Sequence, residues 1–438
     1  MTDKKYHVIT YGCQMNEFDT EVYSKFLEEM GYAETVSPED ADILVFNTCA
    51  VRENADKRLY GRLGQAVEWK RNRPGMVIAV CGCVARKDGQ AMADRFSHVD
   101  LVSGPGDITS FKDNIIEILR GKTPVVSVSS TGDELDLSAS RKSSVSAWVP
   151  VSAGCDLKCA YCIVPYVRGD LRSRQPENIL KEVRELVDGG FKEIILLGQN
   201  VNRYGLDLRP RVKFFELIRD IGGIDKDFRL RFVSPYPKGF TEELIAAMAE
   251  VPQVCEHIHL PLQAGDDNVL KRMRRGYTGE EFVKLVADLR AAIPGLSITT
   301  DIIVGFPGET GEQFENTMKL VEEARFDNAF MFAYSARSGT EAAKMEDQVP
   351  HEEIMQRLYR LIEVQNSIMF DKNSAFLGKT VEVLVEGPSK KDPSRMTGRT
   401  RDNRVVVLEG EMFKPGEVVF VKIDKTFLWG LKGSRPGG

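Results

Sequence analysis

Apolar runs alternate with amphipathic stretches over the first 125 residues of the chain. The apolar runs predict strands at 6–11, 42–47 and 76–81. The spacing of apolar residues predicts helices at 17–30, 54–70 and 107–119, the first of which would end at Gly31. Strand and helix alternating in this way predict a parallel sheet covered by helices, an α/β domain over residues 1–125.

The stretch 121–146 is rich in Ser, Thr and Gly, and we expect it to contain a linker over 126–146. Beyond it, apolar runs predict six strands at 148–153, 193–197, 229–233, 257–262, 297–304 and 329–334. Helical spacing appears between them at 176–188, 242–250, 279–292 and 311–324. Consecutive βα units of this kind predict a partial (β/α)6 barrel over 147–372, with function on the loops that follow the strands.

A long amphipathic stretch at 351–372 predicts a helix, and short apolar alternations separated by Gly and Pro follow it over 374–438. These alternations predict a small all-β barrel. The tail carries 12 Lys and Arg against 8 Asp and Glu, whereas the whole chain has a net charge of −6. A basic barrel on an acidic body suits a nucleic-acid tether, although a solvated surface of mixed charge explains the same count.

Composition narrows the class of protein. A length of 438 residues is enough for about three domains at roughly 150 residues each. The chain is 42% apolar and 28% charged, which excludes a disordered protein. No apolar run approaches the ~18 residues of a membrane span, and the charged start of the chain is unlike a secretion signal, so we expect a cytoplasmic protein.

Eight cysteines are too few for a disulfide scaffold in a chain of this length, so we expect free thiols or metal ligands. Cys155, Cys159 and Cys162, hereafter the loop trio, have the spacing CxxxCxxC and directly follow the first predicted barrel strand. Soft thiolates select iron–sulfur clusters or zinc. A [4Fe–4S] cluster has four ligand positions, so three thiolates leave one iron open to a small molecule. Zinc would want a fourth Cys or His close by, and the sequence offers none there.

Cys13, Cys49 and Cys83, hereafter the strand-end trio, each follow one predicted strand of the N-terminal sheet. The carboxyl ends of parallel strands share one edge of a sheet, so these thiols can meet and hold a second cluster with an open iron. The alternative is a set of buried core cysteines. Cys81 is expected to face the same way as Cys83 and to be a core residue or a neighbour of the cluster. We expect Cys255 to be structural.

The loop trio, with Tyr161 before its last cysteine, resembles the CxxxCxΦC signature of the radical S-adenosylmethionine (radical SAM) superfamily. The resemblance implies a [4Fe–4S] cluster whose open iron binds S-adenosylmethionine, and a 5′-deoxyadenosyl radical formed by reductive cleavage of that molecule. It also implies that the ends of the second and fifth barrel strands lie along S-adenosylmethionine. The expected contacts are Tyr161, Gln199, Asn200, Gln263 and Asp301.

The strand-end trio makes the resemblance more specific, to one family within the superfamily. Its cysteines lie in the segments YGCQMN, NTCAVRENA and GCVA. These resemble the methylthiotransferase family of radical SAM enzymes, and the likeness covers essentially the whole chain. It implies an N-terminal domain with an auxiliary cluster, a radical SAM core and a C-terminal TRAM domain that binds RNA. The segments are most similar to the branch that acts on N6-dimethylallyladenosine at position 37 of tRNA.

The resemblance also makes the chemistry coherent. Replacing the C2–H of adenine by a methylthio group is hard at neutral pH, and a radical cofactor avoids that barrier. A second [4Fe–4S] cluster can hold the incoming sulfur, while S-adenosylmethionine serves as methyl donor and as radical source. The implied partners are tRNA, a flavodoxin- or ferredoxin-like electron donor and a sulfur-delivery system.

Arginines near both ends of the predicted site are candidates for RNA contacts, since guanidinium groups pair with phosphate and stack on splayed bases. A salt-bridged surface is the alternative, because acidic residues follow closely. The candidates are Arg168, Arg172, Arg174, Arg399 and Arg401.

Three other functions stay open from the sequence. The substrate can be a ribosomal-protein aspartate or a differently modified adenosine. The chain can also be a non-catalytic iron–sulfur protein that binds RNA, or a structural zinc protein. The five histidines show no ligand spacing, and His257 and His259 are expected to be packed or hydrogen-bonded on one strand.

Overall fold

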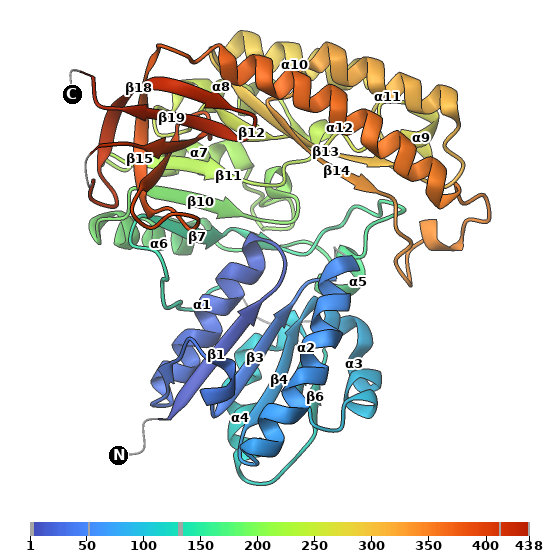
Figure 1. The fold of residues 1–438 in the computed structure, drawn as a ribbon, viewed down its shortest axis with the longest axis vertical. Helices are drawn as coiled ribbons and strands as arrows, with labels where there is room; N and C mark the ends of the chain where they lie inside the picture. Colours follow the sequence, from blue (N-terminus) through green and yellow to red (C-terminus); the bar gives the residue numbers. More distant parts are fainter. Residues whose placement is uncertain (1–3, 51–52, 130–134, 411–412, 437–438) are drawn as a thin grey trace.

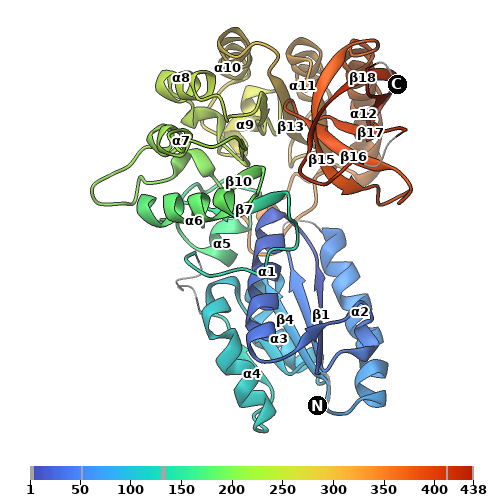
Figure 2. The same ribbon diagram turned by 90° about the vertical axis from the view of Figure 1, so that its left-hand side faces the viewer.

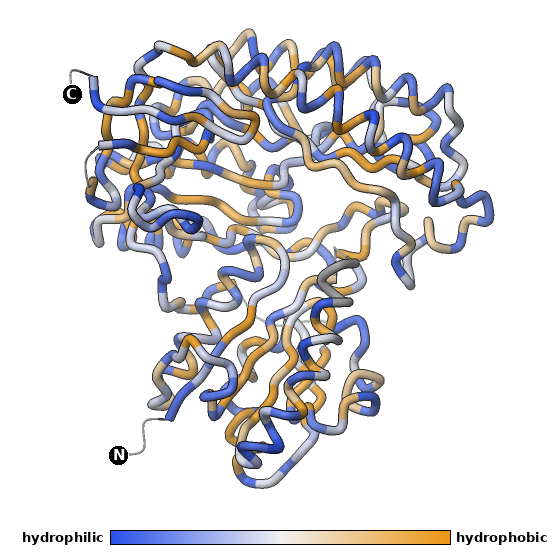
Figure 3. Tube along the Cα trace, viewed as in Figure 1, coloured by the Kyte–Doolittle hydropathy of each residue, from blue (hydrophilic) through white to orange (hydrophobic). Residues whose placement is uncertain are grey.

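The computed structural model describes residues 4–50, 53–129, 135–410 and 413–436. Figure 1 shows three parts: an α/β unit near the N-terminus, a larger set of parallel strands and helices, and a small barrel at the C-terminus. Coloured by hydropathy, the strands of the first two parts are mostly apolar, whereas the helices alternate between apolar and polar turns (Figure 3). Among the described helices, none is long and apolar enough to cross a membrane.

The N-terminal sheet is parallel throughout, with the strand order β2-β1-β3-β4-β5-β6. The predicted strands are present as β1 (Lys5–Thr10), β3 (Ile43–Thr48) and β4 (Val77–Gly82). The shorter strands β2 (Ala33–Glu34), β5 (Leu101–Ser103) and β6 (Val125–Ser127) were not predicted. Two to three residues leave too little apolar pattern for a strand to be recognised in the sequence.

Helices cover both faces of this sheet, as Figure 2 shows from the side. They are α1 (Gln14–Glu29), α2 (Glu53–Asn72), α3 (Cys83–Arg95) and α4 (Phe111–Leu119). Alternate residues of the central strands enter two separate cores: Val45 packs with α1 and α4, whereas Leu44 packs with α2 and α3. A strand buried on both faces explains the continuous apolar run in its sequence.

The six predicted barrel strands are all present, in two parallel sheets of three. The first contains β7 (Ser146–Pro150), β10 (Glu193–Leu197) and β11 (Arg229–Phe232). The second contains β12 (His257–His259), β13 (Ser297–Val304) and β14 (Asn328–Ala333). A single parallel bridge between Leu230 and Val254 joins the two, and one hydrophobic core underlies both. The outer helices include α6 (Pro176–Asp188), α7 (Phe214–Gly222), α8 (Glu242–Glu250), α10 (Gly279–Ala292) and α11 (Gly311–Ala324).

The N-terminal unit packs into the first of these sheets. Ile195 and Leu197 of β10 are buried in the same core as Phe18 and Val22 of α1. Trp148 of β7 also packs against that core. Helix α1 therefore closes one side of the partial barrel and brings the N-terminal sheet to the mouth of the barrel.

Helix α12 (His351–Ser374) runs along β14 and leads to a closed barrel with the strand order β15-β16-β17-β19-β18. Its strands are β15 (Thr380–Pro388), β16 (Met396–Thr400), β17 (Val405–Leu408), β18 (Val418–Phe427) and β19 (Gly430–Ser434). The sequence did not predict β16, whose Thr and Gly content hides its alternation.

The turn between β16 and β17 attaches the closed barrel to the core. Arg231 donates to the carbonyl oxygens of Thr400 and Arg401, at 2.9 and 2.8 Å. Arg401 pairs with Glu256 at 2.8 Å, between Nε and Oε2. The closed barrel is therefore held in a defined place against the six-stranded core.

Candidate functional site

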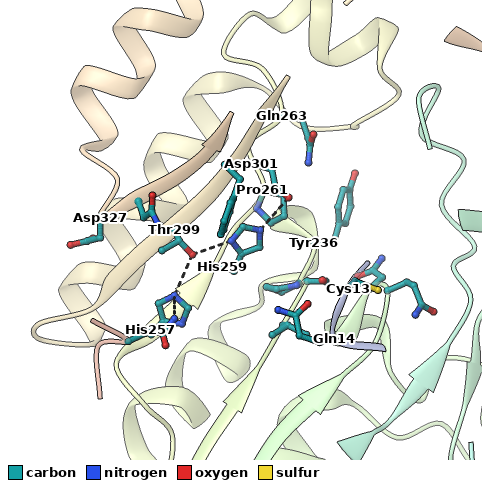
Figure 4. A pocket seen from close by; sticks show the side chains of 18 of the residues that line it. Cys13, Gln14, Tyr236, His257, His259, Pro261, Gln263, Thr299, Asp301 and Asp327 are labelled. Atoms are coloured by element: carbon teal, nitrogen blue, oxygen red, sulfur yellow. Dashed lines mark hydrogen bonds and ion pairs between the residues drawn. The ribbon is translucent and has the colours of Figure 1, made fainter. Parts of the chain in front are cut away.

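One cavity of about 660 Å³ lies where the three parts meet. It is lined by residues of the N-terminal unit, the core and the closed barrel, and Figure 4 shows Cys13 and Gln14 opposite the histidines of β12. All six predicted cluster ligands line it, the loop trio together with the strand-end trio. The structure thus brings both trios to a single space.

The loop trio is held by backbone hydrogen bonds around its loop. Cys155 N–H donates to Gly169 O at 3.0 Å, and Ala160 N–H donates to Met273 O at 3.0 Å. Gly154 has a φ of +77°, and a Cβ there would lie 2.0 Å from Asp170 O, so only glycine fits. These contacts fix the conformation of the loop that carries the three cysteines.

Two thiols of the loop trio, those of Cys155 and Cys162, ionise less readily than a free cysteine. Burial raises the pKa of Cys155 and raises that of Cys162 to about 12. A metal centre supplies the charge that stabilises a thiolate. The three sulfurs line one cavity, and three thiolates on a [4Fe–4S] cluster would leave one iron without a protein ligand.

Arg275 lies beside the loop trio. Its Nη1 is 3.5 Å from Cys159 Sγ, and its other donors reach Tyr277 Oη at 3.0 Å and Pro261 O at 3.2 Å. The guanidinium also lies over the ring of Tyr236, 4.7 Å from the centroid. Among the described residues no carboxylate pairs with Arg275, so a buried positive charge without a carboxylate partner faces this trio.

The strand-end trio depends on tight turns at the ends of β1, β3 and β4. Gly12 has a φ of +126°, and a Cβ there would lie 2.3 Å from the Cβ of Cys49. Gly82 has a φ of +90°, and a Cβ there would lie 2.5 Å from Thr48 O. Both glycines let a cysteine-bearing turn approach its neighbouring strand.

A buried amide network supports these turns. Asn16 Nδ2 donates to Asn47 Oδ1 and to Thr48 O, each at 3.0 Å, and Asn47 Nδ2 donates to Asn16 O at 2.7 Å. A hydrogen bond to Cys49, helped by the nearby Arg168, lowers the pKa of Cys13 to about 6. Burial raises the pKa of Cys83. The three sulfurs form a second donor set that suits a cluster.

Arg168 lies beside this second trio, not on the surface. It is buried, and its Nη2 pairs with Asp19 Oδ2 at 2.7 Å. The guanidinium also interacts with Cys13 and Cys83. Unlike Arg275, Arg168 has a carboxylate partner, so the strand-end trio faces a neutral ion pair.

The expectation that Cys81 and Cys83 face the same way is wrong. Strand β4 ends at Gly82, whose positive φ turns the chain, and Cys83 begins α3. Cys81 instead packs in the core with Tyr23, and burial raises its pKa to about 12. Cys255 is buried outside the cavity, which agrees with a structural role.

All five residues predicted to contact S-adenosylmethionine line the cavity: Tyr161, Gln199, Asn200, Gln263 and Asp301. Gln199 is engaged, because its Oε1 accepts from Gly154 N–H at 2.5 Å. The side chain of Asn200 is buried, and its hydrogen bond to the Cys155 thiol partly offsets the rise in the pKa of Cys155 that burial causes. Asn200 therefore interacts with the loop trio and lines the space that is expected to hold S-adenosylmethionine.

The candidate RNA contacts mostly have internal partners. Arg174 is buried and pairs with Asp136 and Glu182, at 2.7 and 2.6 Å. Arg172 is half-buried and donates to Arg168 O at 3.2 Å. Arg401 pairs with Glu256, as described above. Arg168, Arg174 and Arg401 therefore form ion pairs within the protein, which is the alternative to RNA contacts that the sequence left open.

Arg399 also lines the cavity, as Arg168 does, and it pairs with Glu386 at 2.9 Å, but unlike Arg168 it belongs to the closed barrel. Val51 and Arg52 of the NTCAVRENA segment lie outside the described residues.

A polar wall inside the barrel was predicted only in part, because Asp301 was an expected site residue whereas His257, His259 and Thr299 were not. Thr299 Oγ1 bonds to His257 Nε2 at 3.2 Å and to His259 Nδ1 at 3.0 Å, and His259 Nε2 is 3.2 Å from Asp301 Oδ2 (Figure 4). Both histidines are hydrogen-bonded, as expected. The missed signal was alternation, since His257 and His259 of β12 and Ser297, Thr299 and Asp301 of β13 are polar, alternate along their strands and line the cavity.

Family models match three stretches of the chain: the Radical SAM superfamily at 149–321, the Uncharacterized protein family UPF0004 at 5–104, and the TRAM domain at 375–434. Among solved structures, the radical S-adenosylmethionine methyltransferase TsrM from Kitasatospora setae is similar, with a TM-score of 0.59 and 15% identity. The match covers 78% of this chain and 77% of that one, and it shows the fold alone.

Two curated relatives match nearly end to end. The tRNA-2-methylthio-N(6)-dimethylallyladenosine synthase of Moorella thermoacetica is 46% identical over 99% of both chains. The enzyme of the same name from Acetivibrio thermocellus is 48% identical over 98% of this chain and 91% of the relative. The chain therefore belongs to the tRNA-2-methylthio-N(6)-dimethylallyladenosine synthase family of radical SAM proteins.

Proposed function

We propose that the protein methylthiolates C2 of N6-(dimethylallyl)adenosine at position 37 of tRNA. It is a radical SAM tRNA methylthiotransferase that uses two [4Fe–4S] clusters and S-adenosylmethionine. The observation that carries this function is the pair of cysteine trios on one cavity, since sulfur insertion needs a radical and a sulfur source within reach of one carbon.

The donor sets fit the two clusters. The loop trio would hold the radical-generating cluster and the strand-end trio the auxiliary one. When bound, the first cluster and S-adenosylmethionine supply a radical that removes hydrogen from C2, and the second supplies the sulfur. Each trio leaves one iron without a protein ligand, as binding of an external group requires.

The chain's own residues orient the reactants and exclude water. Asn200 interacts with Cys155 and presents its amide to the space for S-adenosylmethionine, and Gln199 holds the cysteine loop through Gly154. Gln263 has a φ of +73° and is buried beside the same space, a strained conformation typical of functional positions. Helix α1 closes the cavity toward β10.

The proposed division of labour follows the chain. Residues 1–125 hold the auxiliary cluster, 126–146 form a linker, 147–372 form the radical SAM core, and 374–438 form the TRAM domain that binds RNA. Arg172 and Arg399 are the members of the predicted RNA set that we retain as phosphate contacts. The reaction further requires an electron donor and a sulfur-delivery system, and we place it in the cytoplasm with its tRNA substrate.

Nucleoside mass spectrometry tests the function. Transfer RNA from cells that lack this protein should lose the 2-methylthio-N6-dimethylallyl nucleoside and accumulate its precursor, and the cloned gene should restore it. A normal profile in those cells would reject the substrate. A methylthiolated ribosomal-protein aspartate or a different adenosine product would reassign it.

A further inference from the structure

We propose that Phe330 seats the target adenine inside the barrel and that Trp429 stacks on the neighbouring base of the RNA loop. The inference rests on the proposed function and adds the residues that receive the substrate. Both side chains line the same cavity as the cysteine trios. Both are exposed although they are large and aromatic, Phe330 at 47% and Trp429 at 66%.

Phe330 lies in the middle of β14, the last strand of the six and the edge of the second sheet. Its backbone pairs in register with Asp301, one of the residues expected to contact S-adenosylmethionine, so Phe330 lies at the same level of the barrel as that residue. The seat therefore lies beside the expected S-adenosylmethionine site and on the same cavity as the loop trio.

The wall around Phe330 is polar. Its ring meets the imidazole of His259 edge to face, with centroids 5.8 Å apart. His259 is in turn held by Thr299 and Asp301. One aromatic face on a wall of hydrogen-bonding groups suits a nucleobase, which has a flat apolar face and a polar edge.

Trp429 lies in the turn between β18 and β19 of the closed barrel. The turn is anchored to the core, because Asn373 Nδ2 donates to Phe427 O and to Leu428 O, both at 2.9 Å. Asn373 in turn bonds to Arg404, which pairs with Asp327 at 2.6 Å. The backbone of the turn that carries Trp429 is therefore anchored beside the start of β14.

Arginine and acidic side chains lie together at this end of the cavity. Arg399 pairs with Glu386 and Arg404 pairs with Asp327 and Asp402, and both guanidinium groups line the cavity together with Trp429. Guanidinium groups beside exposed aromatic rings form the usual combination for single-stranded RNA, in which phosphates pair and bases stack. A splayed anticodon loop offers both groups at once.

The test uses the holoenzyme and a fluorescently labelled anticodon stem–loop that carries the prenylated adenosine. We expect Phe330→Ala and Trp429→Ala each to weaken binding by roughly 5- to 100-fold, the range of one lost base stack. Phe330→Tyr keeps the ring and should restore affinity. Tyr359→Ala removes a 63% exposed aromatic of α12 that does not line the cavity, and should bind normally.

Two further readouts separate a seat from a structural role. Phe330→Ala should raise the KM for RNA and leave reductive cleavage of S-adenosylmethionine without RNA unchanged. Unchanged RNA affinity in both alanine variants would overturn the proposal. Loss of S-adenosylmethionine cleavage with normal RNA binding would assign Phe330 to the cofactor instead. Either result leaves the methylthio product of the wild-type enzyme, and so the proposed function, intact.

Discussion

The loop trio comes from one short loop that contains Cys155, Cys159 and Cys162. The strand-end trio comes from the ends of three strands, and its cysteines at 13, 49 and 83 are 36 and 34 residues apart in sequence. The loop trio is placed by nearby backbone bonds, such as that from Cys162 N–H to Cys159 O at 3.0 Å. The strand-end trio is placed only when the N-terminal sheet has formed. One site thus depends on local geometry and the other on tertiary structure.

The two trios also differ in the charge beside them. Arg275 faces the loop trio with neutral partners, among them Tyr277 and Pro261. Arg168 faces the strand-end trio already paired with Asp19. An uncompensated cation favours the reduced, more negative form of a cluster, which is the form that cleaves S-adenosylmethionine.

The largest expected effect comes from removing the loop trio. The triple variant Cys155→Ala, Cys159→Ala and Cys162→Ala should abolish both S-adenosylmethionine cleavage and methylthiolation, because no ligands for the radical cluster remain. Iron analysis and electron paramagnetic resonance of the reduced protein should still show the auxiliary cluster. Loss of all iron would mean that the two sites are not independent.

A matched pair of glycine variants should separate the sites next. Gly12→Ala forces a Cβ against Cys49, and we expect it to lose the auxiliary cluster while keeping S-adenosylmethionine cleavage. Gly154→Ala forces a Cβ against Asp170 O, and we expect the reverse. Iron content, cleavage and methylthiolation are measured on both. Equal loss of both clusters in each variant would show global unfolding instead.

The difference in charge beside the two trios predicts a smaller effect, on the midpoint potential of the radical cluster. Arg275→Gln should shift the midpoint potential of the radical cluster to more negative values, and Arg275→Lys should restore part of the shift. Arg168→Gln leaves Asp19 buried without its partner, so the free energy of unfolding should fall by about 3–5 kcal/mol. Pairing it with Asp19→Asn should recover much of that loss. An unchanged potential in Arg275→Gln would refute the electrostatic role.

The smallest expected effect is on how the stability of the fold depends on pH. Burial, with Arg231, His259, Arg399 and Arg404 nearby, holds the pKa of His257 well below its usual 6.5. The unfolded chain takes up a proton below that pH and the folded chain does not. Stability should therefore fall by up to about 1.4 kcal/mol per pH unit below 6.5. Denaturant titrations should show a flatter profile for His257→Asn, and identical profiles would contradict this origin.

Much of the architecture could be predicted from the sequence, because strand–helix alternation and the CxxxCxxC loop are local patterns. The strand-end trio was also predictable, since each cysteine follows an apolar run. The orientation of Cys81 was not, because it depends on the positive φ of Gly82. The burial of Arg168 was not either, because its partner Asp19 is 149 residues away in sequence.

Most of the polar wall and Phe330 were missed for a related reason. The alternation of residues along β14 does not predict which face of the strand stays open to the cavity. Phe330 is half exposed because β14 is the edge strand of its sheet. Sequence patterns predict which residues share a face, whereas packing decides whether that face is covered.

The central claim is that two cysteine trios hold two clusters that act together on one cavity. The most direct test compares the wild type with the variant in which Cys13, Cys49 and Cys83 are all replaced by Ala. Iron content, S-adenosylmethionine cleavage and RNA methylthiolation are measured on one anaerobic preparation of each protein. The account predicts about eight irons falling to about four, with cleavage kept and methylthiolation lost. Four irons in the wild type, or a variant that still methylthiolates RNA, would contradict it.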